Sequence, residues 1–419
     1  MADLASGAGG RLRIRVESGK HDSAQFDFAS RTYRNPFTPG DVALRFSNRG
    51  FPRAMDNTGW SERSVTLDRW EGKSAVITLS YEAEDGAAFI ANPVIFSARA
   101  ERRYNVIYLV FDGVSTRHWS MYNPDSSLNP FMKRVADREF VVFDNMFTLG
   151  DKTRISTSGL FCSLFPFLTR HGINRNFIPE SEIDLFHRQV RRGAIATLPD
   201  VFRRQGYISE QFGNSGFTVQ LLSTGIDYGF ERSFEFSFNP YDSYGLSRRF
   251  FEFLRKNRDR EFFTYLHYNT PHKPFYAPAN YYLSGLVNSP LGSLWRPDFM
   301  GCLRYTDDVF ENIYHALKTH NLLENTIIVV ATDHGAGFDL SKFDSGFQYA
   351  DFTRMTYMVR LPEALKGKLG VTAKRIPAFI SSINNAPTLC ELAGVPAPAA
   401  FAGKSFVPVL AGQNGREFF

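Results

Sequence analysis

The pattern of apolar and polar residues changes near residue 100. Before that point the chain shows short runs in which apolar and polar residues alternate, with Gly, Asn and Pro between them; the clearest are residues 11–16, 64–67, 74–81 and 93–96. Alternation with a period of two is typical of strands that bury one face. We therefore predict a β-sandwich accessory domain over residues 11–100, preceded by a disordered leader of residues 1–10.

From residue 104 onward, apolar strand-like runs alternate with amphipathic helical segments. The predicted strands are residues 106–111, 207–209, 262–266 and 327–330, and the predicted helices are residues 131–136, 197–206 and 297–319. Strands that alternate with helices are typical of a parallel sheet covered on both faces. The sequence thus predicts an α/β fold with a doubly wound, mostly parallel sheet over residues 104–419.

Two of the predicted strands are followed by residues of types that commonly bind metal ions. Asp112-Gly113 follows the first strand, and Asp333-His334-Gly335 follows the last. Open α/β sheets place their ligand sites at the carboxyl ends of the strands, so these side chains are candidate metal ligands. For either motif alone, an ordinary turn or a helix cap is the favoured interpretation.

A third segment, residues 150–162, is rich in small and hydroxyl residues where a helix is predicted to begin. Thr153 lies at that start between Lys152 and Arg154. The N-terminus of a helix carries a positive field that favours an alkoxide and attracts an anion. The competing interpretation is that Thr153, Ser156 and Thr157 are plain capping and helix hydroxyls.

A fourth segment places His267 and His272 in a loop bounded by prolines, directly after a predicted buried strand. Loops at strand ends carry functional residues more often than cores do. Two imidazoles in one such loop indicate a contact with an anionic substrate or with a transferred proton.

Composition narrows the function classes. The chain has 419 residues, of which 43% are hydrophobic and 22% charged, and its net charge of +5 suits an anionic substrate. No dense run of Lys and Arg argues for nucleic acid. No apolar stretch is long enough to span a bilayer, and the start lacks the apolar core of a signal peptide. We expect a cytoplasmic protein, or a soluble one whose anchor was removed; the oligomeric state stays open.

Taken in order, these segments resemble the alkaline phosphatase and sulfatase superfamily. The resemblance covers about residues 104–410 and is strengthened by further segments in the order typical of that superfamily: residues 128–136, 143–148, 321–326, 386–396 and 403–406. In the first domain, Trp70-Glu71-Gly72-Lys73 and Ala91-Asn92-Pro93 loosely resemble jelly-roll carbohydrate-binding modules, although a purely structural sandwich is the favoured interpretation.

The nucleophile position distinguishes the branches of this superfamily. Sulfatases use a Cys or Ser that is oxidised to formylglycine, and Thr153 occupies that position here. Threonine carries a methyl group on Cβ and cannot become the aldehyde, and Cys162 lies too far along the helix to replace it. The segment is more similar to the phosphoethanolamine and phosphoglycerol transferases, including lipoteichoic-acid-synthase-like enzymes, which use threonine directly.

That resemblance implies a single metal site, because no His follows His334 to complete a second one. The implied ligands are Asp112, Thr153, Asp333 and His334, a set that suits one divalent ion, with Mn²⁺ or Mg²⁺ preferred over Zn²⁺ or Ca²⁺. Thr153 would form a phospho-threonine intermediate, and His272 would protonate the leaving alkoxide. The implied substrate contacts are His267, Lys152, Arg154 and Asn214.

The leading hypothesis is therefore a metal-dependent phosphoryl-group transferase or phosphodiesterase, acting on a glycan- or lipid-linked phosphodiester. One alternative is a sulfatase-type hydrolase of sulfuric esters. A second alternative is a catalytically inactive member of the superfamily that binds glycans through the first domain. The donor, the acceptor and the role of the first domain are not determined by the sequence.

Overall fold

The structure is a computed structural model of the whole chain. It describes residues 2–5, 11–29, 61–63, 65–82, 89–91, 102–169, 180–213, 225–230, 232–235, 243–272, 275–281, 296–335 and 352–413. The chain divides into two compact units, residues 1–100 and residues 101–419. Each unit is described separately below.

The first unit contains two small antiparallel sheets. Strands β2 (Arg11–Ser18), β3 (Asp22–Ala29) and β5 (Val76–Glu82) form one of them in the order β3-β2-β5. Alternate residues of β2, namely Leu12, Ile14 and Val16, are buried together with Trp70 of the short 3-10 helix η3 (Asp68–Trp70). Strands β1 (Ala2–Ala5), β4 (Ser61–Arg63) and β6 (Phe89–Ala91) form the other sheet in the order β4-β1-β6.

Two predictions for this unit were wrong. Residues 1–10 were expected to be a disordered leader, but Ala2–Ala5 pairs with β4 and β6. Both partner strands lie far away in the sequence, so the four residues themselves do not indicate the pairing. Residues 65–67 were expected to be part of a strand, but they form the loop that leads into η3. Val65 and Leu67 pack against the core from this loop. Residues 93–96 lie outside the described residues. The complete sandwich stays a prediction.

The second unit is built on one large, mostly parallel sheet, as the sequence predicted. Its strands follow the order β10-β9-β11-β7-β12-β14-β8, and β13 and β15 both pair with β8. Pairing is parallel from β10 to β12 and between β8 and β15. In contrast, β13 pairs antiparallel with β8, and β14 pairs antiparallel with both β8 and β12. The strands are β7 (Asn105–Phe111), β8 (Phe140–Phe147), β9 (Ile208–Gly213), β10 (Arg232–Glu235), β11 (Phe262–Tyr268), β12 (Thr326–Ala331), β13 (Arg354–Met355), β14 (Tyr357–Arg360) and β15 (Arg375–Ser381).

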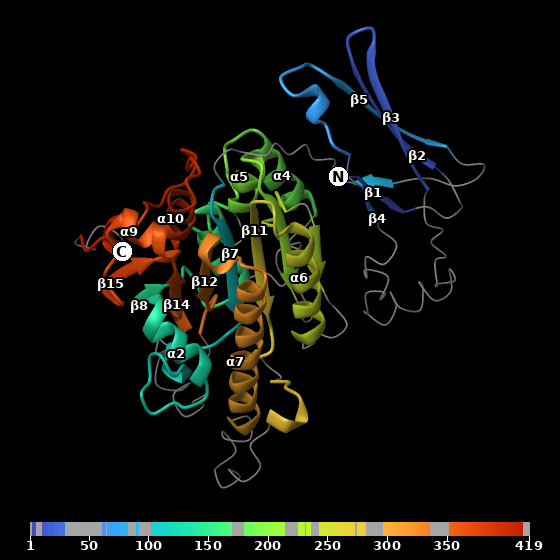
Figure 1. Cartoon of the computed structure of the whole chain (residues 1–419). Helices are drawn as coiled ribbons and strands as arrows, with labels where there is room; N and C mark the ends of the chain where they lie inside the picture. Colours follow the sequence, from blue (N-terminus) through green and yellow to red (C-terminus); the bar gives the residue numbers. More distant parts are fainter. Residues whose placement is uncertain are drawn as a thin grey trace. The chain divides into compact units, whose positions relative to one another are not determined.

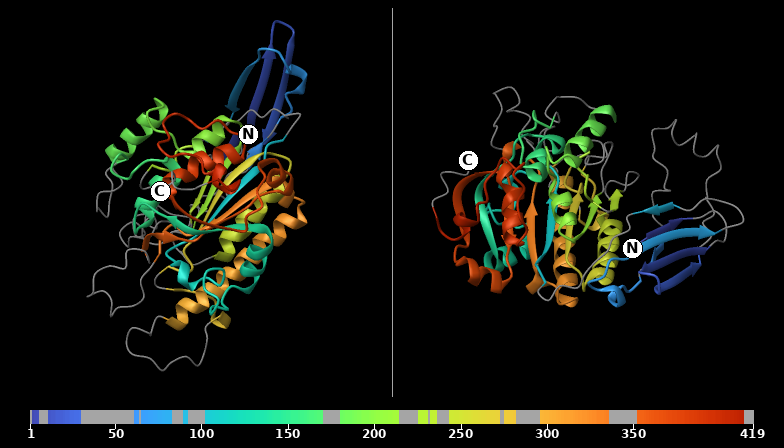
Figure 2. Two further views of the ribbon diagram at one scale, coloured as in Figure 1. Left: turned by 90° about the vertical axis from the view of Figure 1, so that its left-hand side faces the viewer. Right: turned by 90° about the horizontal axis from the view of Figure 1, so that it is seen from above.

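Helices cover both faces of this sheet (Figures 1 and 2). Helices α2 (Pro130–Glu139), α6 (Ser243–Asn257) and α7 (Arg296–Thr319) pack together on one face. The other face carries α3 (Thr153–Cys162), α5 (Leu198–Arg204) and α10 (Asn385–Leu392). The remaining helices are α4 (Glu180–Arg191), α9 (Glu363–Leu369), α11 (Val407–Leu410), η4 (Thr116–His118), η5 (Ala279–Tyr281), η7 (Leu323–Asn325) and η9 (Ser382–Asn384). Each predicted helix has an observed counterpart, and Gly206, at φ 87°, ends the α5 segment.

Phe143 anchors the end of this sheet and provides a test of the core. It is fully buried on β8, with its ring centroid 5.2 Å from those of Tyr357 and Phe406. Replacing it with alanine should lower the free energy of unfolding by about 3–5 kcal/mol, because the substitution removes both aromatic contacts and leaves a cavity in the core. Denaturant titration measures this loss.

The matched control is Phe379→Ala on the neighbouring strand β15. Phe379 stacks on Phe147 with a centroid distance of 6.0 Å, but 53% of it is exposed. Its replacement should cost less than about 1 kcal/mol. Equal losses for the two variants would contradict the assignment of Phe143 to the core.

Candidate active site

The alternation of side chains along three adjacent strands places the central residues of the site. On β7, Val106, Tyr108 and Val110 belong to the core on the α3 side of the sheet. Val110 pairs with His267 of β11 on one side and with Ala331 of β12 on the other. Because successive side chains alternate in a strand, Asp112 and Asp333, each two residues farther on, continue the same face.

Asp112, His267 and Asp333 form a compact buried group. One ligand atom from each of the three lies within 4.8 Å of the other two. His267 Nε2 is 3.1 Å from Asp112 Oδ2, and Asp333 Oδ1 accepts hydrogen bonds from the backbone N–H of Gly113 and of His334. The other oxygens, Asp112 Oδ1 and Asp333 Oδ2, are buried and make no hydrogen bond within the described residues.

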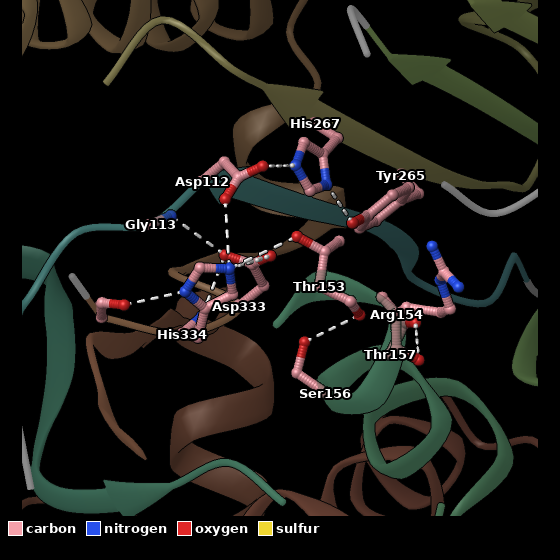
Figure 3. Close-up of polar contacts among 11 residues, drawn as sticks. Asp112, Gly113, Thr153, Arg154, Ser156, Thr157, Tyr265, His267, Asp333 and His334 are labelled. Atoms are coloured by element: carbon pink, nitrogen blue, oxygen red, sulfur yellow. Dashed lines mark hydrogen bonds and ion pairs between the residues drawn. The ribbon is translucent and has the colours of Figure 1, made fainter. Parts of the chain in front are cut away.

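His334 faces both of these oxygens. Its Nε2 lies 3.5 Å from Asp112 Oδ1 and 3.6 Å from Asp333 Oδ2. Its Nδ1 is 2.8 Å from the carbonyl oxygen of Gly335, so an Nδ1–H that donates there leaves the Nε2 lone pair directed at the carboxylates. This arrangement is shown in Figure 3.

Thr153 is the first residue of helix α3 and is 6% exposed. Its Oγ1 is 3.4 Å from His334 Nε2, so the hydroxyl points into the same pocket as the carboxylates (Figure 3). The hydroxyl also lies at the positive end of the helix, where a developing negative charge is stabilised. The structure therefore brings the predicted nucleophile to the predicted metal ligands.

His272 lies close to Gly113 in the turn that follows Asp112. A Cβ atom on Gly113, which has φ 67°, would be 3.3 Å from His272 Cδ2 and 3.6 Å from His334 Cε1. This close approach is possible because glycine has no side chain. The absence of a side chain at Gly113 therefore allows the rings of His272 and His334 to approach the turn that carries Asp112.

Charges within the pocket balance each other. Burial by itself raises the pKa of Asp112, but the charges of His272, His267 and His334 outweigh it and hold this pKa well below its usual range. Burial lowers the pKa of His267 and His334, and the carboxylates of Asp112 and Asp333 outweigh it, so both pKa values lie above normal. The carboxylate of Asp112 is thus held ionised, as metal binding requires.

The donor set fits a divalent metal ion. Two buried carboxylates each keep one oxygen without a hydrogen bond, and an imidazole nitrogen and a threonine oxygen face the same space. Buried carboxylates without hydrogen bonds are costly unless a positive charge compensates them. Asp112, Thr153, Asp333 and His334 could therefore hold one ion, whose identity the fold does not establish.

The other predicted contacts are placed differently. Lys152 is exposed at the N-cap of α3, and Arg154 is half-buried, with its side chain extending away from the carboxylates (Figure 3). Asn214 lies outside the described residues. Sequence reasoning missed Tyr265, whose hydroxyl is 2.5 Å from His267 Nδ1. The available signal was its position two residues before His267 in a strand, which puts both side chains on one face.

Comparison with known proteins identifies the family of this chain. The sulfatase family model matches residues 104–395. An N-acetylglucosamine-6-O-sulfatase of Bacteroides thetaiotaomicron is 32% identical over 28% of this chain and 20% of its own length. An ulvan-active sulfatase of Formosa agariphila is 20% identical over 72% of this chain and 63% of its own length. The matches thus span less than two thirds of these relatives.

Solved structures share the fold. A phosphonate monoester hydrolase of Agrobacterium radiobacter superposes with a TM-score of 0.59 at 16% identity, over 76% of this chain and 79% of that one. Within the described residues, no helix is both long and apolar enough to cross a membrane. The family match covers most of the chain and contains every residue of the buried pocket. The chain belongs to the sulfatase family, within the alkaline phosphatase and sulfatase superfamily.

Proposed function

We propose that this family member is a metal-dependent phosphoryl-group transferase or phosphodiesterase in which Thr153 is the nucleophile. The observation that carries the proposal is the position of Thr153 Oγ1, at the N-terminus of α3 and 3.4 Å from His334 Nε2. The hydroxyl lies where the pocket collects its carboxylates and imidazoles. Threonine cannot be oxidised to an aldehyde, so this pocket favours direct attack on phosphorus.

The first step forms a bond between Thr153 Oγ1 and phosphorus. The field at the N-terminus of α3 favours the alkoxide of Thr153 and attracts the anionic phosphodiester. A divalent ion held by Asp112, Thr153, Asp333 and His334 would supply Lewis-acid stabilisation of the developing negative charge. Breaking the bond to the leaving alkoxide leaves the group on Thr153 as a phosphodiester of threonine.

The leaving alkoxide needs a proton, and we assign this proton to His272. Its ring lies beside Gly113, next to the residue that begins the carboxylate pocket. Water or an acceptor hydroxyl then attacks phosphorus and gives its proton to His272, and Thr153 leaves as the alkoxide with which the cycle began. Lys152, Arg154 and Asn214 remain proposed contacts for the anionic substrate.

Sulfuric ester hydrolysis is the second candidate function. The two relatives described above are sulfatases by name, which supports this reaction as well as the first. The residue at position 153 supports the first candidate, because formylglycine chemistry needs a Cys or Ser there. The third candidate, glycan binding without catalysis, requires that the carboxylate pocket have no chemical role.

A substrate comparison with intact mass spectrometry tests the proposal. The full chain, loaded with Mn²⁺, is incubated with phosphodiesters linked to lipid or to glycan, with a phosphonate monoester and with an aryl sulfate. We expect turnover of phosphodiesters and a covalent adduct whose mass equals that of the transferred phosphoryl group, located on Thr153 by peptide fragmentation. Turnover of the sulfate alone would favour sulfatase chemistry, and no turnover with normal metal binding would favour glycan binding.

A further inference from the structure

His267 and Tyr265 together form a structure that neither substrate binding nor core packing requires. Both lie on β11, two residues apart, so their side chains emerge from the same face of the sheet. His267 pairs in register with Val110, next to the strand end that carries Asp112. His267 therefore enters the carboxylate pocket from the strand beside β7 and is only 6% exposed.

The two nitrogens of His267 have separate partners. Nδ1 is 2.5 Å from the Tyr265 hydroxyl, and Nε2 is 3.1 Å from Asp112 Oδ2. His334 is held in the same way, with Nδ1 on the Gly335 carbonyl and Nε2 facing the carboxylates. A metal-ligating imidazole usually donates one ring N–H to an outer partner, which fixes the ring and leaves the other nitrogen to face the metal. Both histidines have such an outer partner, and their other nitrogens face the carboxylates.

Tyr265 is itself rigidly held. It is 1% exposed, and the Phe161 ring of α3 packs edge-on against it at a centroid distance of 4.9 Å and an angle of 86°. The Tyr108 ring lies 6.1 Å away on its other flank. A hydroxyl can both donate and accept, so Tyr265 can accept a hydrogen bond from Nδ1–H while Nε2 uses its lone pair. Figure 3 shows this chain of contacts from Tyr265 through His267 to Asp112.

Including His267 adds a second imidazole to the set of candidate metal ligands. The ligand atoms of Asp112, His267 and Asp333 lie within 4.8 Å of one another, close enough for one ion to bridge them. Two imidazoles and two carboxylates suit Mn²⁺ and Zn²⁺, whereas Mg²⁺ and Ca²⁺ prefer oxygen ligands alone. A buried ion pair between His267 and Asp112, without any role toward a metal, is the competing interpretation.

We propose that His267 is an additional metal ligand, and that Tyr265 is the positioning residue that holds it, so that the site selects a transition-metal dication over Mg²⁺ and Ca²⁺. This inference rests on the metal site in the proposed function and moves His267 from substrate contact to metal ligand. It also moves the expected metal from Mn²⁺ or Mg²⁺ toward Mn²⁺ or Zn²⁺.

The test counts imidazole ligands without any substrate. Full-length protein labelled with ¹⁵N-histidine is loaded with Mn²⁺ and studied by pulsed electron paramagnetic resonance. We expect coupling to two imidazole nitrogens in the unsubstituted protein and to one in His267→Gln. In Tyr265→Phe, which keeps the ring, we expect the coupling to one imidazole to change and the Mn²⁺ affinity to fall by about 10–100-fold. Mg²⁺ affinity should change much less in both variants.

Tyr268→Phe is the matched control. Tyr268 is fully buried on the same strand, but its hydroxyl bonds to Ser247 Oγ at 2.9 Å, on the α6 side of the sheet. This variant should leave the nitrogen count and both metal affinities unchanged. A single imidazole in the unsubstituted protein, or equal losses of Mn²⁺ and Mg²⁺ affinity in His267→Gln, would overturn the inference. The resonance experiment uses no substrate, so its outcome does not depend on the proposed reaction. If the substrate experiment gave no adduct on Thr153, that result would refute the proposed function alone.

Discussion

Replacing Thr153 with alanine is expected to reduce turnover by about 10⁴-fold or more and to abolish the covalent adduct. The estimate follows the loss seen when an enzyme loses its nucleophile, where only binding and electrostatic stabilisation remain. Thr153 is positioned for this role because its Oγ1 shares the pocket with His334 Nε2 at 3.4 Å. Steady-state rates and intact mass measure the two effects. Thr153→Ser, which keeps a hydroxyl, should retain part of the activity and form the corresponding adduct on serine.

Thr157→Ala is the control for this experiment. Thr157 lies one turn farther along α3 and is fully buried, but its Oγ1 bonds to the carbonyl oxygen of Arg154, within the helix. Its replacement removes the same atoms from the same helix without touching the pocket, so turnover should stay within about threefold, a change of less than 1 kcal/mol in the barrier. If Thr153→Ala retained most of the activity, water would be the nucleophile and Thr153 would act only as a ligand.

Much of the second unit could be predicted from sequence because its signals are local. Four apolar runs and three amphipathic segments were sufficient to indicate a parallel sheet covered by helices. The positions of Asp112 and Asp333 directly after two of these runs also placed them at one edge of the sheet. Strand register then explains why they meet, since Val110 lies between His267 and Ala331. Sequence could indicate the edge but not this register.

What sequence could not predict depends on contacts between distant residues. His267 was assigned to a substrate-binding loop because it precedes a Pro-bounded segment, but it is a β11 residue buried beside Asp112. Tyr265 looked like an ordinary core residue, and its position two residues before His267 became informative only once His267 was seen to lie beside Asp112. The strand Ala2–Ala5 was missed for the same reason, because both of its partners are more than 50 residues away.

Replacing Asp333 with asparagine is expected to remove metal binding and, with it, the stabilisation that metal provides. The unsubstituted protein should show a Tm that rises with Mn²⁺ concentration, because a ligand bound only by the folded state contributes about 2.7 kcal/mol at 100 times its Kd. In Asp333→Asn the rise should disappear, since the variant loses a charged ligand whose Oδ2 has no hydrogen bond among the described residues. Thermal scans and elemental analysis after dialysis measure the two quantities.

Asp307→Asn separates a metal effect from a general effect of losing a buried carboxylate. Asp307 is 4% exposed on α7, and its oxygens accept hydrogen bonds from the backbone N–H of Phe131 and Met132 at the start of α2. Its replacement should shift the Tm without metal but leave the Mn²⁺-dependent rise intact. Asp333→Asn should abolish the Mn²⁺-dependent rise and leave the Tm without metal largely unchanged. The metal-free protein should tolerate this change because two nearby buried carboxylates repel each other when no cation lies between them. A Mn²⁺-dependent rise that survived in Asp333→Asn would place the metal elsewhere in the chain and remove the basis for the active site proposed above.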